Sequence, residues 1–435
     1  MPVSNKDTSD DTDAQSALTV ITDHYVCSGD FNGILASSLA EQLGLSRSSL
    51  LQILEQLLLV SERIVIAFDC YQGNPYILRI PQPDTQRQIA LMESEALHTF
   101  CVYPSAKILA NRKDLGSFAD KPFTRRLALG EAQLIPVFFE LSVLEAYYRD
   151  PRYHFHYGDM DGRIVITDKA FRSAQVDDRD KILLDTFGIG YDECRNRVVI
   201  AYLRYLSILS PEHQQIWNAH VVRCPCVMNS DYERATLYGV WPEHHSAYQA
   251  FLAEMVEINK LSVVINKPSL FRDDFSAGRP LGLHPMLRPT GRNLQEFVHL
   301  LDKMLSENVD RDFFKNDIPL EEEHQRGDGK IQVVPRGTLA LLKDWISTRY
   351  RDADGADVSD EIVESFKRIR KLRQKPAHEI QQDNFDIALP GQQDKLLLDV
   401  LQALQKLRWV LMSHPVVRGK YKPPDWLDGD KIVMY

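Results

Sequence analysis

The chain has 435 residues, 44% of them hydrophobic and 26% charged, with a formal net charge of −10. Its length is typical of two or three domains. Its net negative charge excludes a protein that covers nucleic acid with a uniformly positive surface. No stretch approaches the roughly 18 apolar residues of a membrane span, and six scattered cysteines favour a reducing compartment, so we expect a soluble cytoplasmic protein without a membrane partner.

The N-terminal part predicts a disordered acidic tail at residues 1–15 and a winged-helix-like domain at residues 16–81. The run SSLAEQLGLSRSSLLQILEQLL has the pattern of two helices broken at Gly44, with Ser46 as the cap of the second. The runs RIVIAFD and PYILRI, joined by a Gly-containing turn, predict a wing hairpin.

The basic content of the second predicted helix is low. A DNA-reading helix should present several Arg, Lys, Asn or Gln side chains, whereas this one carries Arg47 and is otherwise rich in Leu. We therefore favour a packing or protein-contact role, and a winged-helix DNA-binding regulator stays open as an alternative.

Residues 82–267 predict an α/β domain of unknown role. The run VFFELSVLEAYY is typical of a helix, and GRIVIT, RVVIAYL and LSVVI are typical of strands. The sequence contains no glycine-rich phosphate loop and no nucleophile elbow, so it indicates no named enzyme class and no cofactor.

Two histidine groups in this middle part favour structural roles. His154 and His156 alternate with aromatic residues, as on the surface of a strand. His220, Cys224 and Cys226 lack zinc-finger spacing, because one residue separates the two cysteines and no second pair follows. We therefore predict no metal site.

A loop rich in Pro, Gly and Arg, at residues 268–289, precedes a predicted all-α bundle at residues 290–435. Helical periodicity covers residues 293–306, 338–350, 359–374 and 392–412. The leucines spaced along the last helix are too few in heptads for a coiled coil, so we assign them to the bundle core. They are Leu397, Leu401, Leu404, Leu407 and Leu411.

The segment FKRIRKLRQKPAHEI is basic, whereas the chain as a whole is acidic. Its cations besides Arg373 are Lys367, Arg368, Arg370, Lys371 and Lys375. A solvated helix face balanced by the acidic residues just upstream explains part of this cluster.

The position of Arg373 is less easily explained. Ile362, Phe366 and Ile369 mark the inward row of the helix, and the next four-residue step falls on Arg373. An inward guanidinium is costly unless paired, so it indicates a site, an ion pair or a subunit interface. His378 follows five residues later, about 140° away on a regular helix, so one chain does not place both side chains on one face.

The stretch Arg373-Gln374-Lys375-Pro376-Ala377-His378 resembles the motif of HEPN domains, an Arg and a His separated by four residues, within a helical bundle. The resemblance covers roughly the last 100 to 150 residues, and Pro376 departs from the simplest helical form of the motif. Many HEPN proteins are metal-independent endoribonucleases of toxin–antitoxin and phage-defence systems, and they join two motifs across a dimer.

The resemblance implies a homodimeric ribonuclease that cleaves tRNA or mRNA as a regulated effector, with an antitoxin or trigger protein as a further partner. His378 would act as general acid or base, Arg373 would stabilise the phosphate charge, and Gln374 would orient either group. The surrounding cations would bind the RNA backbone. A non-catalytic dimeric module that binds a nucleotide or a protein is the first alternative.

Overall fold

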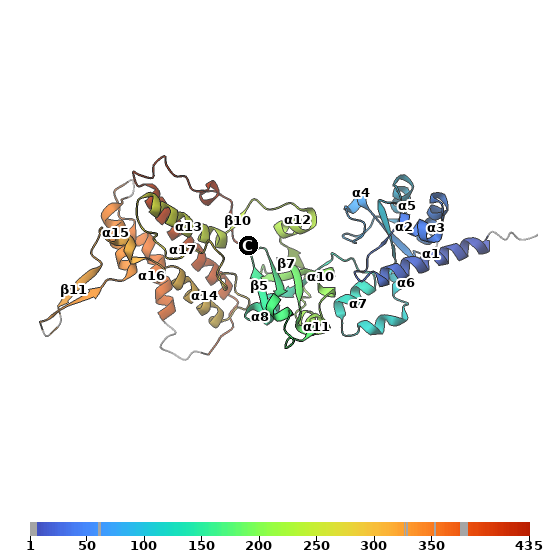
Figure 1. Cartoon of the computed structure of the whole chain (residues 1–435), viewed down its shortest axis with the longest axis horizontal. Coiled ribbons are helices and arrows are strands. Elements are labelled where there is room, and N and C mark those ends of the chain that lie inside the picture. Colours follow the sequence, from blue (N-terminus) through green and yellow to red (C-terminus); the bar gives the residue numbers. More distant parts are fainter. Residues whose placement is uncertain (1–6, 60–61, 326, 328, 352–353, 375–381) are drawn as a thin grey trace, which may run out of the picture. The chain divides into compact units, whose positions relative to one another are not determined.

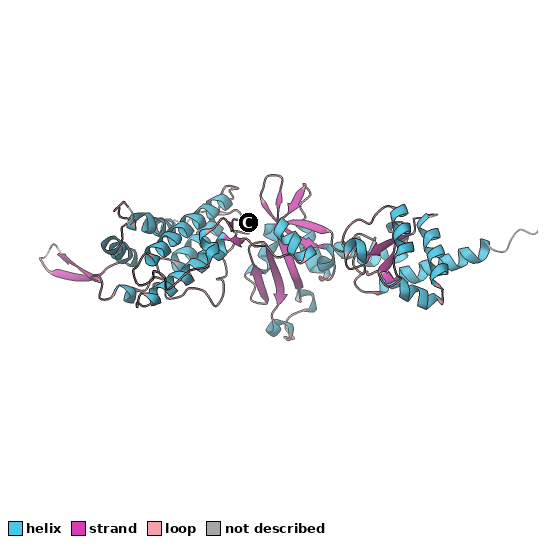
Figure 2. Cartoon of the chain, turned by 90° about the horizontal axis from the view of Figure 1, so that it is seen from above, coloured by secondary structure: helices cyan, strands magenta, loops and turns pink. Residues whose placement is uncertain are grey.

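The computed structural model describes residues 7–59, 62–325, 327, 329–351, 354–374 and 382–435. It shows a mixed α+β fold with several antiparallel sheets, which agrees at that level with the α+β multidomain chain that the sequence predicts (Figures 1 and 2). The chain divides into two compact units: residues 1–157 with 161–232, and residues 158–160 with 233–435.

The first helix corrects the predicted N-terminal tail. Helix α1 (Asp7–Cys27) includes residues 7–15. Ala14, Leu18 and Ile21 are buried at four- and three-residue steps, so one face of this helix packs into the core although its sequence looks acidic.

The next two helices confirm the prediction. Helix α2 (Ala36–Leu43) ends at Gly44, which adopts the left-handed conformation with φ of 64°, and helix α3 (Arg47–Leu59) follows. The backbone N–H of Ser49 donates to the Ser46 hydroxyl over 3.2 Å, so Ser46 caps α3 as predicted.

The predicted wing hairpin is wrong. Strand β2 (Ile64–Phe68) forms, but residues 75–80 are an irregular loop that the Gln72 side chain holds by donating to the carbonyls of Asn74 and Ile77. The partner of β2 is β3 (Phe100–Pro104), after α4 (Asp69–Gln72) and α5 (Thr85–Ser94), and with β1 (Ile34–Leu35) they form an antiparallel sheet of order β1-β3-β2.

An antiparallel sheet organises the rest of the first unit, where we predicted an α/β domain. Five strands run in the order β4-β8-β7-β6-β5, and β9 adds to β7. The predicted strands at GRIVIT and RVVIAYL are confirmed as β6 and β8. The strands are β4 (Pro136–Glu140), β5 (Tyr153–Tyr157), β6 (Asp161–Ile166), β7 (Leu183–Asp192), β8 (Arg197–Tyr202) and β9 (Cys226–Met228).

The run VFFELSVLEAYY is only partly helical. It starts as β4, passes through a 3-10 turn, η2 (Leu141–Leu144), and ends as one helical turn, α8 (Glu145–Tyr148). The other short helices here are α6 (Ala106–Leu109), η1 (Lys113–Phe118), α7 (Pro122–Ala128), α9 (Asp168–Phe171), η3 (Asp178–Asp180), α10 (Leu203–Ser207), α11 (Pro211–Ala219) and α12 (Ser230–Tyr238).

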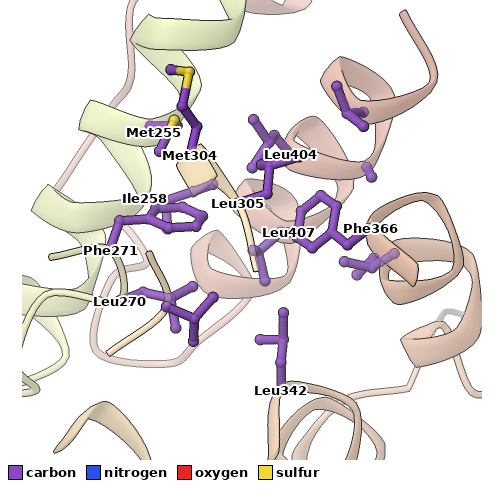
Figure 3. Close-up of a cluster of buried hydrophobic side chains, with 14 of the residues drawn as sticks. Met255, Ile258, Leu270, Phe271, Met304, Leu305, Leu342, Phe366, Leu404 and Leu407 are labelled. Atoms are coloured by element: carbon purple, nitrogen blue, oxygen red, sulfur yellow. The ribbon is translucent and has the colours of Figure 1, made fainter. Parts of the chain in front are cut away.

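Among the described residues, five long helices and the segments that connect them form the core of the second unit, and Figure 3 shows part of it. The four predicted helices are confirmed, and the last one begins at Leu389, before the predicted start at residue 392. The helices are α13 (Ala247–Val264), α14 (Gly291–Met304), α15 (Thr338–Arg349), α16 (Ser359–Gln374) and α17 (Leu389–Met412). The leucine row of α17 is buried in this core, as expected.

Two features correct the prediction of an all-α bundle that starts at residue 290. The run LSVVI is the end of α13, whose start is fixed by a capping box between Ser246 and Gln249, so this helix joins the bundle from the preceding segment. The first half of the polar run EEEHQRGDGK is strand β11 (Glu321–Gln325), which pairs in antiparallel with β12 (Ile331–Pro335) just after the run.

Short elements complete the unit: η4 (Arg311–Phe314), η6 (Asp425–Asp428), β10 (His245–Ser246) and β13 (Ile432–Val433). Strand β13 pairs in parallel with β10, and the Trp426 ring stacks on His245 with 3.9 Å between centroids. The C-terminal segment therefore packs against the bundle.

Candidate functional site

Helix α16 ends at Gln374, so its last two residues, Arg373 and Gln374, are the part of the predicted motif that the structure describes. Ile362, Phe366 and Ile369 are buried as predicted, and Arg373 lies in the last turn with one third of its side chain exposed. The inward row inferred from the sequence is therefore confirmed.

The guanidinium of Arg373 is paired. Its Nη1 donates to Asp302 over 2.5 Å and also to the carboxylate of Glu307. Asp302 is fully buried on α14, where the Ser306 hydroxyl donates to it and Arg370 Nε lies 3.7 Å away. Of the three readings that the sequence left open, the ion pair is present.

These contacts determine the electrostatics of the site. The hydrogen bonds from Arg373 to Asp302, and then to Glu307, raise the pKa of the guanidinium, so it stays charged. Two carboxylates face Arg370 and Arg373, and the four formal charges cancel. The buried Asp302 therefore orients Arg373, and Glu307, whose side chain is 40% exposed, is the carboxylate that an incoming anion could replace.

The other cations that we predicted to bind RNA differ in their partners and in their exposure. Arg368 binds Asp399 of α17 over 2.8 Å and Lys367 lies 3.9 Å from Glu364, whereas Lys371 is exposed. Gln374, the last residue of α16, is also exposed. Lys375 and His378 lie outside the described residues.

The upstream acids balance this cluster only in part, through the contact of Glu364 with Lys367. Asp360 binds Lys343 of α15 over 2.6 Å, and Glu361 binds Lys406 of α17. Asp360 and Glu361 therefore link helices, and the exposed Lys371 contributes positive charge in the last turn of α16.

The chain after the motif returns to the start of α14. The backbone N–H of Gly291 donates to the Asn384 carbonyl over 2.9 Å, and that of Arg292 donates to the Asp383 carboxylate over 2.9 Å. Gln295, one turn further, donates to the Arg373 carbonyl over 3.4 Å. The segments on both sides of His378 are thus attached to the same part of α14.

Sequence reasoning missed the partners of Arg373. Asp302 lies four residues after the buried Val298, so the row argument that singled out Arg373 would also have identified Asp302. Arg408 was missed in the same way: it follows Leu404 by four residues on α17 and is fully buried against Glu254.

The only basic residue of α3 is engaged within its own unit. Arg47 Nη2 donates to the carbonyls of Glu93 and Glu95, each over 2.9 Å. A side chain held by two carbonyls is poorly placed to read bases, which weakens the DNA-binding alternative.

The other histidine and cysteine groups form no metal site among the residues that the structure describes. His154 and His156 share the exposed face of β5, and His220 Nδ1 lies 3.1 Å from the Ser142 hydroxyl. The Cys226 thiol donates to the Cys224 carbonyl over 3.4 Å.

No protein-family profile, curated protein or solved structure matches this chain. Over the described residues, no helix combines the length and apolar character needed to cross a bilayer. The HEPN resemblance therefore stays a prediction from the motif and its helical setting.

Proposed function

We propose that the second unit is a metal-independent endoribonuclease whose active site includes the end of α16. The observation that carries the proposal is the placement of Arg373: a buried carboxylate orients this half-buried cation, and His378 follows five residues later. A preorganised guanidinium is suited to stabilise charge that develops on a phosphate.

In the proposed reaction His378 removes the proton of an RNA 2′-hydroxyl. The 2′-oxygen attacks the adjacent phosphorus, and the 5′-oxygen of the next nucleotide leaves with a proton from a second acid. The products are a 2′,3′-cyclic phosphate and a 5′-hydroxyl. Arg373 stabilises the negative charge on the phosphate oxygens, and Gln374, exposed beside it, orients the phosphate or His378.

In this proposal, the less tightly paired cations of α16 and Lys375 bind the RNA backbone. Lys371 is exposed, Lys367 is only loosely paired, and Lys375 follows in the sequence. Arg368 and Arg370 contact Asp399 and Asp302, so they hold the helix in place and add less to RNA binding. A tRNA or an mRNA is the proposed substrate, and a second copy of the chain supplies the second His378.

The proposed biological role is a toxin or phage-defence effector. The first unit would then receive a trigger or an antitoxin, because a minimal nuclease needs no such domain.

The test is incubation of the full chain with total RNA and tRNA in EDTA. Wild type and His299→Ala, which removes an exposed histidine of α14, should cleave and leave cyclic phosphate ends, whereas His378→Ala should not. Cleavage by His378→Ala equal to that of wild type would reject the proposal. The proposal would also be rejected if overexpression of wild type slows growth but the purified protein cleaves no RNA.

The non-catalytic alternative has its own support, because the pairing of Arg373 with Asp302 and Glu307 accounts for its position without any substrate. In that case the bundle binds a protein or a nucleotide, and the growth of cells that overexpress wild type and His378→Ala is the same.

A further inference from the structure

The hairpin of β11 and β12 lies outside the core of the second unit (Figures 1 and 2). Nine of its ten strand residues are exposed, and Val334 is half-buried. Among the described strands, β11 and β12 pair only with each other. An isolated two-stranded hairpin is marginally stable in water, so this one lacks the packing that usually supports such a structure.

The base of the hairpin, in contrast, is firmly built. Arg336 N–H donates to the Leu320 carbonyl over 3.0 Å, and Arg311 donates to the carbonyls of both residues. Arg336 also donates to the Pro319 carbonyl over 3.1 Å and pairs with Asp344 of α15. The two strands are therefore held at a fixed point of the bundle while their length projects into solvent.

The two outer edges of the hairpin differ in charge. Strand β11 carries Glu321, Glu322 and Glu323, and negative charges along an edge oppose pairing with another copy of that edge. Strand β12 has the sequence IQVVP, without a charged residue. Its β-branched side chains favour strand pairing, and Ile331 and Val333 are 65% and 54% exposed.

We propose that β12 pairs edge to edge with β12 of a second copy of this chain, giving a four-stranded sheet of order β11-β12-β12-β11. The charge pattern selects this partner, because an antiparallel pair of β12 strands juxtaposes uncharged, β-branched residues and leaves the glutamates on the outer edges. Pro335 lies at the end of the strand, where a missing N–H costs least. This association is separate from the ribonuclease proposal.

A matched pair of substitutions tests it. Ile331 and Gln325 face each other in the ladder, so Ile331→Lys and Gln325→Lys add the same charge at the same level of the hairpin on opposite edges. We measure the weight-average molar mass of the full chain over a series of concentrations by sedimentation equilibrium. For wild type and Gln325→Lys the mass should double with concentration, from one copy to two or, if the chain already dimerises at the proposed active site, from two copies to four.

Ile331→Lys should raise the dissociation constant of this step by about tenfold or more, because it replaces an apolar, β-branched side chain of the pairing strand with a charged one in each copy. Ile331→Thr, which keeps a β-branched residue, should preserve association. Hydrogen exchange supplies a second measurement: β12 amides of wild type should be protected at high concentration and exposed in Ile331→Lys. A wild-type mass that does not depend on concentration, or equal effects of the two lysine variants, would overturn the proposal.

Discussion

Arg408 of α17 and Glu254 of α13 form an ion pair in which both side chains are fully buried, with 2.7 Å between Nε and Oε2. Arg408 Nη2 also lies 2.6 Å from Asp428 in the C-terminal segment. The pair joins the two helices and attaches the end of the chain to them. Burial raises the pKa of Glu254 to about 7, although the hydrogen bond from Arg408 opposes this shift.

Arg408→Met should lower the free energy of unfolding by about 3–5 kcal/mol, because it leaves Glu254 buried without its cation. The loss should be larger at pH 8 than at pH 5.5. The folded-state pKa of Glu254 is raised, so protonation below about pH 7 favours the folded state and removes the unpaired charge. Urea unfolding at the two pH values measures the difference.

Arg368→Met is the control for this prediction. It breaks the more exposed pair with Asp399 and should cost about 1 kcal/mol or less at either pH. A loss for Arg408→Met that does not vary with pH would contradict the role assigned to Glu254.

Asp317 provides a second pH-dependent contribution to stability. Its carboxylate accepts from Trp345 Nε1 over 2.6 Å, contacts Arg349 over 3.0 Å and binds Lys267. Burial acts to raise its pKa, but the hydrogen bonds from Arg349, Lys267 and Trp345 outweigh burial and lower the pKa to about 2.

A lowered pKa means that Asp317 stabilises the fold above its unfolded pKa near 4 and that this contribution is lost as the pH falls toward 2. Asp317→Asn should therefore cost about 2 kcal/mol at pH 7 and much less at pH 2.5. Asp425→Asn, in an exposed pair with Lys422, should change stability little at either pH. Thermal unfolding across this range checks both variants, and equal losses at the two ends would exclude the ion network as the cause.

Helices α14 to α17 were predictable because their apolar residues repeat over several turns, whereas α13 was missed because its last residues, LSVVI, have the composition of a strand. Short apolar runs were less predictable: the strands β6 and β8 were identified, but others were not. Residues 137–139, VFF, suit a strand or a buried helix equally well. They form a strand because they pair with β8, which lies some sixty residues later in the chain. The strand β3 was missed for the same reason, since its partner β2 is remote in sequence.

The candidate site was also predictable only in part. The inward position of Arg373 follows from the periodicity of α16, but its carboxylate partners come from α14 and the turn after it, about 70 residues earlier. A single helix sequence shows that a buried guanidinium needs a partner. It does not show which partner the fold supplies, and this is why the site and ion-pair readings could not be separated before the structure.

The pair of Asp302 and Arg373 allows stability and chemistry to be tested apart. Arg373→Met should destabilise the chain by roughly 1–3 kcal/mol, because Asp302 stays buried with Ser306 and the more distant Arg370 as its remaining partners. Replacing both groups, as Asp302→Leu with Arg373→Met, should recover most of this loss, since no buried charge is left unpaired.

If Arg373 acts on RNA, the recovered double variant should still fail to cleave, while Glu307→Gln, which keeps both Arg373 and Asp302, should cleave at least as well as wild type. Urea unfolding and the RNA assay in EDTA are run on the same preparations. Cleavage that returns together with stability in the double variant would show that Arg373 supports only the fold, and the catalytic role would then have to be assigned to other residues.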